Sequence, residues 1–556
     1  MTAASETAAM PAGKAVVSRI IPYVAPALVL LAVVVPFLRF NQYSLLMPES
    51  VILMAGAAAI GLAVGAIGRI RTSTLAPMLM ALTLGVYLFY RQEVTDFLIA
   101  IAQRAGDLTG YPVVALAALG VALFLALCLI CVLMRRHLDT VVAAIFGTIV
   151  LSTIVLPTDT GGEPVQTGAL PKALKPLPPV IHIILDEHIG LSGLPEGLAE
   201  SDKARRAIES TYKDFALYSR AYSRFAETKF SFTSLMNGDA GADVSDLIES
   251  STYKFVLKEN RWFDLLKAKG YAIKVYESAW YEMCGPSAPV DACYSYSFFS
   301  PNAIQRTGLP LEARLRALAQ KLFIGRNALQ MEPLVATEAL MRFRSDIAAN
   351  PRGVAYIVHL LLPHFGYLYG DDCTLLDPSE WQREGYGDDE RYSAAERQDM
   401  YRRYLNQVVC AETQMDDLFA QLKTIGVYDE ATIIVHGDHG SRIGERPYII
   451  AHPEMLTAQD LLDHYATLLA IKAPGIKPGM NNAPVALQAI FADTFLGGAI
   501  ETAAPPNTVF MRVDEHDNFR QVELAWPQDS APIVSLPAVN GLDLAKIEQA
   551  LPELRR

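Results

Sequence analysis

Charged side chains are scarce in the first 157 residues of this 556-residue sequence, where five long apolar segments follow one another. The segments span residues 20–38, 51–68, 75–90, 112–134 and 138–157. Each is close to the roughly 20 residues that a helix needs to cross a bilayer. Transport proteins usually carry charged groups at mid-membrane, so this scarcity indicates an anchor and argues against a transporter.

A basic excess is also absent from the sequence. The chain has 47 Lys and Arg residues against 59 Asp and Glu residues, and its formal net charge is −12. An acidic chain gives no electrostatic reason to expect nucleic acid as a partner. The composition therefore predicts a membrane protein that does not bind nucleic acid.

The few basic residues near the apolar segments predict their orientation. One side of the membrane would carry Lys14, Arg19, Arg69, Arg71, Arg135 and Arg136, and the other Arg39, Arg91 and Arg104. The richer side is expected to be cytoplasmic, which places everything after the fifth crossing outside the cytoplasm. We therefore predict a five-helix transmembrane anchor (1–157), a linker rich in Gly, Pro and Thr (158–179) and an extracytoplasmic domain (180–556).

Cysteine is rare, with six residues in the whole chain, of which two lie in the fourth apolar segment. The predicted extracytoplasmic domain holds the other four, which are Cys284, Cys293, Cys373 and Cys410. An oxidising compartment permits two disulfides, most simply Cys284–Cys293 and Cys373–Cys410. A zinc cluster is the alternative, although the spacings match no common ligand pattern.

Apolar runs of strand length alternate with helical patterns after residue 180. Strands are expected at 180–185, 272–276, 354–362 and 431–436, and helices at 204–215, 262–269 and 394–423. Such alternation predicts an α/β sandwich with a largely parallel sheet. In these sheets, ligands bind beyond the carboxyl ends of the strands.

Acids and imidazoles occur where the expected strands end. Asp186 and Glu187 follow the first strand, His364 follows the third, and Asp438 and His439 follow the fourth between two glycines. Each alone is also a common turn residue. Together, the carboxylates and an imidazole suit Mn²⁺ or Zn²⁺, so the sequence predicts a site for one or two divalent ions.

A hydroxyl-rich run begins at Thr228 and leads into an expected helix over 229–236. Free N–H groups and the helix dipole favour an anion at such a start. Thr228 is a candidate nucleophile, activated by a divalent cation, and also a candidate N-cap of the helix. Lys229 either neutralises a phosphate or faces solvent, and His436 either joins the site or is an ordinary packed histidine.

These motifs resemble the alkaline phosphatase/sulfatase superfamily, specifically its membrane-anchored transferase branch, which includes lipoteichoic acid synthase and the phosphoethanolamine transferases. The resemblance is carried by residues 404–440, by the Pro363-His364 dipeptide and by residues 468–475. It implies that Thr228 is the nucleophile, that His364 binds substrate, and that Asp186, Asp438 and His439 hold the metal. Glu187 occupies the second acid of the sulfatase "DD" pair.

The nucleophile motif departs from that of the sulfatases. Sulfatases convert Cys or Ser to formylglycine, with Pro and Arg two and four residues later, where this chain has Thr228, Phe230 and Phe232. Threonine cannot give that aldehyde, so sulfate-ester hydrolysis is disfavoured. A threonine alkoxide that attacks phosphorus instead gives a phospho-threonine diester, which an acceptor hydroxyl can resolve.

The resemblance therefore implies a bacterial inner-membrane enzyme with its catalytic domain on the periplasmic face. It would transfer phosphoethanolamine or phosphoglycerol from a phospholipid donor to an envelope glycan or lipid acceptor. One alternative is a hydrolase that uses water as acceptor, either a phosphodiesterase or a sulfuric ester hydrolase. The other is a catalytically inert ectodomain that serves as an assembly module.

Overall fold

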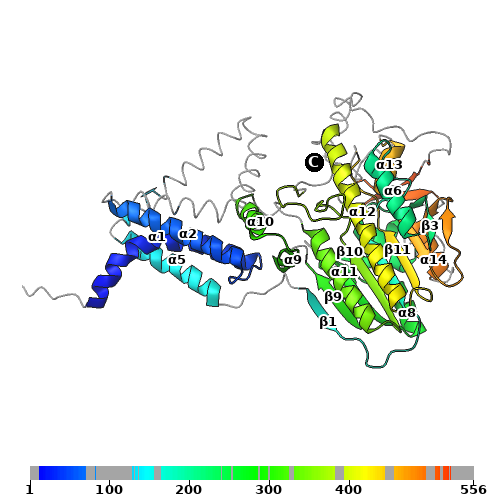
Figure 1. Cartoon of the computed structure of the whole chain (residues 1–556), viewed down its shortest axis with the longest axis horizontal. Coiled ribbons are helices and arrows are strands. Elements are labelled where there is room, and N and C mark those ends of the chain that lie inside the picture. Colours follow the sequence, from blue (N-terminus) through cyan, green and yellow to red (C-terminus); the bar gives the residue numbers. More distant parts are fainter. Residues whose placement is uncertain are drawn as a thin grey trace, which may run out of the picture. The chain divides into compact units, whose positions relative to one another are not determined.

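The chain divides into two compact units, described here from a computed structural model (Figure 1). One unit comprises Met1–Gly161 with Gly308–Ala328, and the other comprises Gly162–Thr307 with Leu329–Arg556. The structure describes residues 12–70, 82, 125, 128–129, 132–134, 137–155, 164–238, 241–251, 254–285, 288–297, 301–324, 331–381, 393–444, 456–495, 507–513, 517–524 and 526.

The first unit contains three described helices that are long and apolar enough to cross a membrane, α1 (Ala12–Phe40), α2 (Pro48–Ile70) and α5 (Leu138–Val155). Helix α1 packs against both others, and α2 approaches it closely at Gly61, where a Cβ atom would come 2.3 Å from the Ala27 Cα. Small residues allow such approaches between membrane helices. The expected spans at 75–90 and 112–134 lie outside the described residues, apart from isolated positions.

The second unit is built around a nine-stranded sheet in the order β1-β9-β7-β10-β2-β11-β12-β3-β13. Its five parallel central strands are β9 (Ala292–Tyr296), β7 (Ala272–Ser278), β10 (Val354–Leu360), β2 (Val180–Leu185) and β11 (Thr432–Gly437). The outer strands are β1 (Val165–Gly168), β12 (Leu469–Lys472), β3 (Ala216–Tyr218) and β13 (Gly479–Asn481). The predicted α/β fold with a largely parallel sheet is confirmed.

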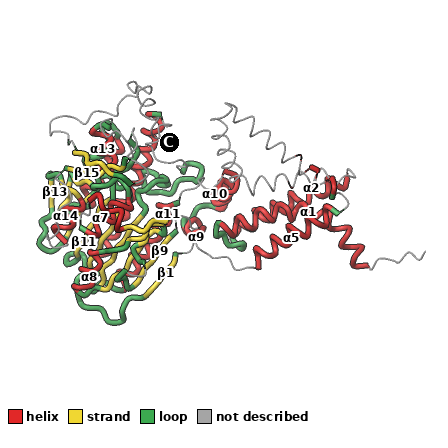
Figure 2. The backbone as a smooth tube through the Cα atoms, turned by 180° about the vertical axis from the view of Figure 1, so that it is seen from behind, coloured by secondary structure: helices red, strands yellow, loops and turns green. Residues whose placement is uncertain are grey.

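Helices cover both faces of this sheet. One face packs on α7 (Thr228–Asn237), α8 (Arg261–Lys269) and α14 (Leu487–Phe495), which lie toward the viewer in Figure 2. The other face packs on α11 (Glu332–Ala349), and α12 (Ala394–Thr424) and α6 (Ala199–Thr211) lie beside it in Figure 1. Every residue of β2 is buried, which explains its continuous apolar run.

Smaller elements complete the unit. Its remaining helices are α9 (Pro301–Arg306), α13 (Ala458–Tyr465) and the 3₁₀ helix at Gly241–Leu247. Its short strands are β4 (Ala221–Tyr222), β5 (Ile248–Ser251), β6 (Lys254–Leu257), β8 (Tyr281–Glu282), β14 (Val485–Ala486), β15 (Thr508–Arg512) and β16 (Phe519–Glu523). Disulfides join Cys284 to Cys293 and Cys373 to Cys410, the pairing expected from the sequence.

Two expected boundaries were wrong. The helix expected at 204–215 is α6, which begins at Ala199 and ends at Thr211, because Glu200 and Asp202 favour an earlier first turn near the positive end of the helix dipole. Residues 165–168, expected within the linker, form edge strand β1, which pairs antiparallel with β9. Sequence alternation did not reveal this strand, since all four of its residues are exposed.

Candidate active site

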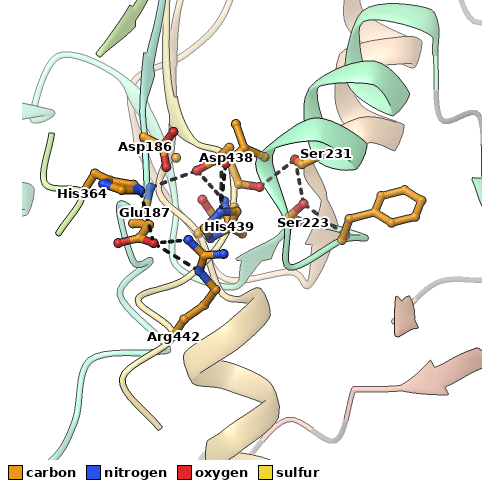
Figure 3. A network of polar contacts seen from close by, with 12 residues as sticks. Asp186, Glu187, Ser223, Ser231, His364, Asp438, His439 and Arg442 are labelled. Atoms are coloured by element: carbon orange, nitrogen blue, oxygen red, sulfur yellow. Dashed lines mark hydrogen bonds and ion pairs between the residues drawn. The ribbon is translucent and has the colours of Figure 1, made fainter. Parts of the chain in front are cut away.

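The site is built at the carboxyl ends of two neighbouring parallel strands. In the pairing of β2 with β11, Leu185 lies opposite Gly437, so Asp186 and Asp438 both follow the last paired residues. The Glu187 N–H donates to the Asp438 Oδ1 atom over 2.9 Å, which ties the two strand ends together (Figure 3). Carboxylates that are 251 or more residues apart in the sequence thus become neighbours.

Helix α7 brings the candidate nucleophile to this edge. Thr228 is its first residue, and its Oγ1 atom lies 3.3 Å from the His439 Nε2 atom. The N-cap is Glu227 rather than Thr228, and it makes no side-chain cap, so the expected N-cap role of Thr228 was wrong. One turn further, Ser231 donates to the Asp438 carbonyl over 2.7 Å and fixes the helix against the β11 loop.

The tautomer of His439 follows from its hydrogen bonds. Its Nδ1 atom lies 2.9 Å from the Gly440 carbonyl oxygen, which can only accept, so Nδ1 carries the proton. Burial lowers the pKa of His439 to about 4. The imidazole is therefore neutral at pH 7, and its Nε2 lone pair faces Thr228, ready to accept a proton or bind a metal.

Three buried side chains could hold a metal ion. Ligand atoms of Asp186, Asp438 and His439 all lie within 4.8 Å of one another. The Asp186 Oδ1 and Asp438 Oδ2 atoms are buried and have no hydrogen-bond partner among the described residues. Uncompensated buried carboxylates are costly, and a divalent cation would offset that cost. Two carboxylates and one imidazole are a donor set that suits Zn²⁺ or Mn²⁺, so the residues present fit a metal ion.

The pKa directions of Asp186 and Asp438 agree with a site that takes a metal ion. Burial and the neighbouring Asp438 carboxylate raise the pKa of Asp186 well above its usual range. For Asp438, burial acts in the same direction, but His439 and the Glu187 N–H outweigh it and lower the pKa. One carboxylate is thus held ionised by the protein, while the other needs a cation to ionise fully at this site.

Glu187, the second predicted acid, has partners within the protein. Its carboxylate pairs with the Arg442 guanidinium (Nε to Oε1, 3.1 Å) and accepts the Phe365 N–H over 3.2 Å. The His364 Nε2 atom lies 3.7 Å from its Oε1 atom. Burial tends to raise the pKa of Glu187, but His364 and Arg442 lower it. Glu187 thus belongs to an ion pair beside the three buried metal-ligand candidates, and it could bind a metal only together with Asp186 and His364.

Helix α12 is hydrogen-bonded to two loops of the site, the loop after β2 and the loop around His364. The Tyr404 hydroxyl accepts the Ile189 N–H over 2.9 Å and donates to the Glu187 carbonyl. The Gln407 side chain donates to the Pro363 and His364 carbonyls and accepts the Leu368 N–H. These bonds fix the backbone that follows the Glu187 side chain and the backbone around His364.

Two functional candidates escaped sequence reasoning. His359, interpreted as a packed strand residue, is buried as expected, but its Nε2 atom lies 2.9 Å from the Asp186 Oδ2 atom. Its pKa is lowered to about 4 by burial, so a neutral ring donates this bond. The only signal was an imidazole within an otherwise apolar strand. Arg442, three residues after His439, gave no signal before its contact with Glu187 was known.

Two predicted substrate-binding residues lie outside the group. The His436 Nε2 atom lies 2.7 Å from the His182 Nε2 atom, inside the sheet rather than at its edge. The Lys229 Nζ atom lies 3.5 Å from an Asp517 carboxylate oxygen and 4.3 Å from the centre of the Phe230 ring. The structure thus brings together Thr228, Asp186, Glu187, His364, Asp438 and His439, but not these two.

Comparisons with solved structures give distant matches. The phosphonate monoester hydrolase of Agrobacterium radiobacter is 13% identical with a TM-score of 0.42, covering 61% of this chain and 80% of that one. The C-terminal periplasmic domain of EptC from Escherichia coli, in complex with zinc, is 13% identical with a TM-score of 0.39, covering 66% and 98%. The lipoteichoic acid synthase LtaP of Listeria monocytogenes is 12% identical with a TM-score of 0.35, covering 63% and 79%.

A search of the curated proteins gave no match. The family model described as Sulfatase matches residues 210–497, which is more than half of the chain. The matched region includes Thr228, His364, Asp438 and His439, and it begins after Asp186. The chain therefore belongs to the Sulfatase family.

Proposed function

We propose that this chain is a membrane-anchored transferase that moves a phospho-alcohol head group from a phospholipid to an acceptor hydroxyl. The observation that carries the proposal is the position of the Thr228 hydroxyl, 3.3 Å from the neutral His439 imidazole and beside two buried carboxylates with unpaired oxygens. Threonine in this position disfavours formylglycine chemistry. It leaves attack on phosphorus as the reaction that the hydroxyl can perform.

A divalent cation held by Asp186, Asp438 and His439 would favour the Thr228 alkoxide and offset charge on the phosphoryl oxygens. The Thr228 hydroxyl loses its proton to solvent and its oxygen forms a bond to phosphorus as the bond from phosphorus to the lipid alcohol breaks; the alcohol leaves with a proton, and a phospho-threonine diester remains. An acceptor hydroxyl then loses its proton and forms its own bond to phosphorus as the bond from phosphorus to Thr228 breaks, and the Thr228 oxygen regains a proton. His364 is partly exposed beside Glu187, where it would protonate the leaving alcohol or take the acceptor's proton.

The rest of the molecule supports a lipid donor and an extracytoplasmic site. The three apolar helices would keep the enzyme in the membrane, where a phospholipid is available. The disulfides Cys284–Cys293 and Cys373–Cys410 suit an oxidising compartment such as the periplasm. We therefore propose phosphoethanolamine or phosphoglycerol as the transferred group, and an envelope glycan or lipid as the acceptor.

The test is mass spectrometry of the full-length protein after incubation with mixed phospholipids and Mn²⁺ or Zn²⁺. We expect a phosphoethanolamine or phosphoglycerol adduct on Thr228, absent from Thr228→Ala and retained in the matched control Ser234→Ala on the same helix. Head-group release with an unmodified Thr228 would instead indicate a hydrolase that activates water directly. Turnover that survives Thr228→Ala in folded protein would contradict the proposal.

A further inference from the structure

Helix α10 (Leu311–Ile324) lies in the catalytic region of the sequence but belongs to the membrane unit. The chain leaves the catalytic unit after Thr307, and it returns to that unit at Leu329. Residues Gly308–Ala328 form one compact unit with Met1–Gly161. The two units are therefore joined by three passages of the chain, although the sequence predicted a single linker.

One face of α10 is buried. Ala313, Ala317, Leu318 and Leu322 are at most 3% exposed, and their spacing of four and five residues places them on one side of the helix. Lys321 is buried on the same side. Helix α10 contacts α2, and it carries Leu311, Glu312 and Arg316 exposed away from that buried side. This pattern is typical of a helix that packs by one face.

A buried acid lies where the two helices meet. Glu49, in the first turn of α2, is only 1% exposed, and the Arg314 Nη1 atom lies 3.9 Å from its Oε1 atom. A buried carboxylate is strongly destabilising without a cationic or hydrogen-bonding partner. A guanidinium supplied by α10 therefore offsets charge burial in α2, which gives the contact a polar, position-specific component besides its apolar face.

We propose that α10 is a docking helix that attaches the catalytic unit to the membrane unit independently of the linker at 158–179. Only residues 307–310 separate α10 from α9, and a connection of this length spans at most roughly 17 Å. This attachment does not depend on the proposed transferase activity.

The test distinguishes attachment through α10 from attachment through the linker at 158–179. A protease site is inserted at 158–163 of the full-length chain, the protein is cleaved in native membranes, and the catalytic fragment is measured in pellet and supernatant. We expect the wild-type fragment to remain in the pellet. Arg314→Glu should lower the ratio of retained to released fragment by about tenfold or more, because two carboxylates would then face each other.

Matched variants distinguish the loss of this one ion pair from a general change in the charge of α10. Arg316→Glu reverses the same charge on the exposed side of α10 and should leave retention unchanged. The charge swap of Glu49→Arg with Arg314→Glu should restore retention, and the two disulfides of the released fragment report that it is folded. Release of the wild-type fragment would overturn the proposal, as would equal release by Arg316→Glu or a swap that fails to restore retention.

Discussion

Two groups of charged residues in the catalytic unit differ in how their acids are paired. Between β7 and α11, the Asp346 Oδ2 atom lies 2.7 Å from the Lys274 Nζ atom, 2.6 Å from the Tyr276 hydroxyl and 3.1 Å from the Arg342 Nε atom. At the ends of β2 and β11, one oxygen of each aspartate, Asp186 Oδ1 and Asp438 Oδ2, has no hydrogen-bond partner among the described residues. The first group holds its own cations, whereas the second lacks one.

The pKa directions of Asp346 and Asp186 differ in the same sense. Burial tends to raise the pKa of Asp346, but the bonds from Lys274 and Tyr276 lower it. The pKa of Asp186 is raised by burial and by Asp438. Glu187, the next residue, behaves like Asp346, because Arg442 pairs with it. We therefore interpret the paired acids as structural and propose Asp186 as a metal ligand.

The sharpest test of this comparison is Asp186→Asn. We expect transfer activity to fall by about 10³-fold or more and metal binding to weaken, because a predicted ligand is lost. The free energy of unfolding of the metal-free protein should stay the same or rise, since a carboxylate with a raised pKa is unfavourable there at pH 7. Isothermal titration with Zn²⁺ and denaturant unfolding measure both. A large loss of metal-free stability would show that Asp186 is structural.

Glu187→Gln should lower stability rather than metal binding, the reverse of Asp186→Asn. We expect the free energy of unfolding at pH 7 to fall by about 3 kcal/mol, because Arg442 loses its buried partner. The pKa of Glu187 lies below its usual value of 4.5, so its stabilisation is present above that value and lost as the pH falls through the folded-state pKa. The stability difference between variant and wild type should therefore be present at pH 7 and shrink as the pH is lowered through the folded-state pKa of Glu187, below 4.5. Metal affinity lost as fully as in Asp186→Asn would make Glu187 a ligand instead.

Lys274→Met should give the smallest effect. We expect the free energy of unfolding to fall by about 2 kcal/mol, because Asp346 keeps Arg342 and Tyr276 as partners. Activity per folded molecule and metal affinity should not change. Thermal unfolding with and without added metal would check this, and a metal-dependent difference between variant and wild type would contradict the assignment of this group as structural.

Much of the fold was predictable because the central strands are buried on both faces. Largely apolar runs marked β2, β7, β10 and β11, and the helical pattern at 394–423 marked α12 almost to the residue. Edge strand β1 was not predictable, since an exposed strand carries no apolar period. Helix α10 was missed because its partner, Glu49, lies more than 260 residues earlier in the sequence.

Site residues that directly follow a strand could be predicted from the sequence, whereas residues whose role depends on a partner distant in the sequence could not. Asp186, Asp438 and His439 could be placed at one edge of a parallel sheet from position alone. The partners Arg442 and His359 could not, because they are identified only by register and by the path of the chain after Gly440. For His436 the sequence left both interpretations open, and the structure pairs it with His182 inside the sheet.

The pairing of β2 with β11 also decides when this protein becomes reactive. Glu187 and the Asp438 carboxylate that it contacts are 251 residues apart, and most of the catalytic unit is synthesised between them. A ribosome-bound chain that has not passed His439 has a threonine but no partners to activate it. The proposed metal site would therefore be complete only after His439 has been synthesised and β2 has paired with β11.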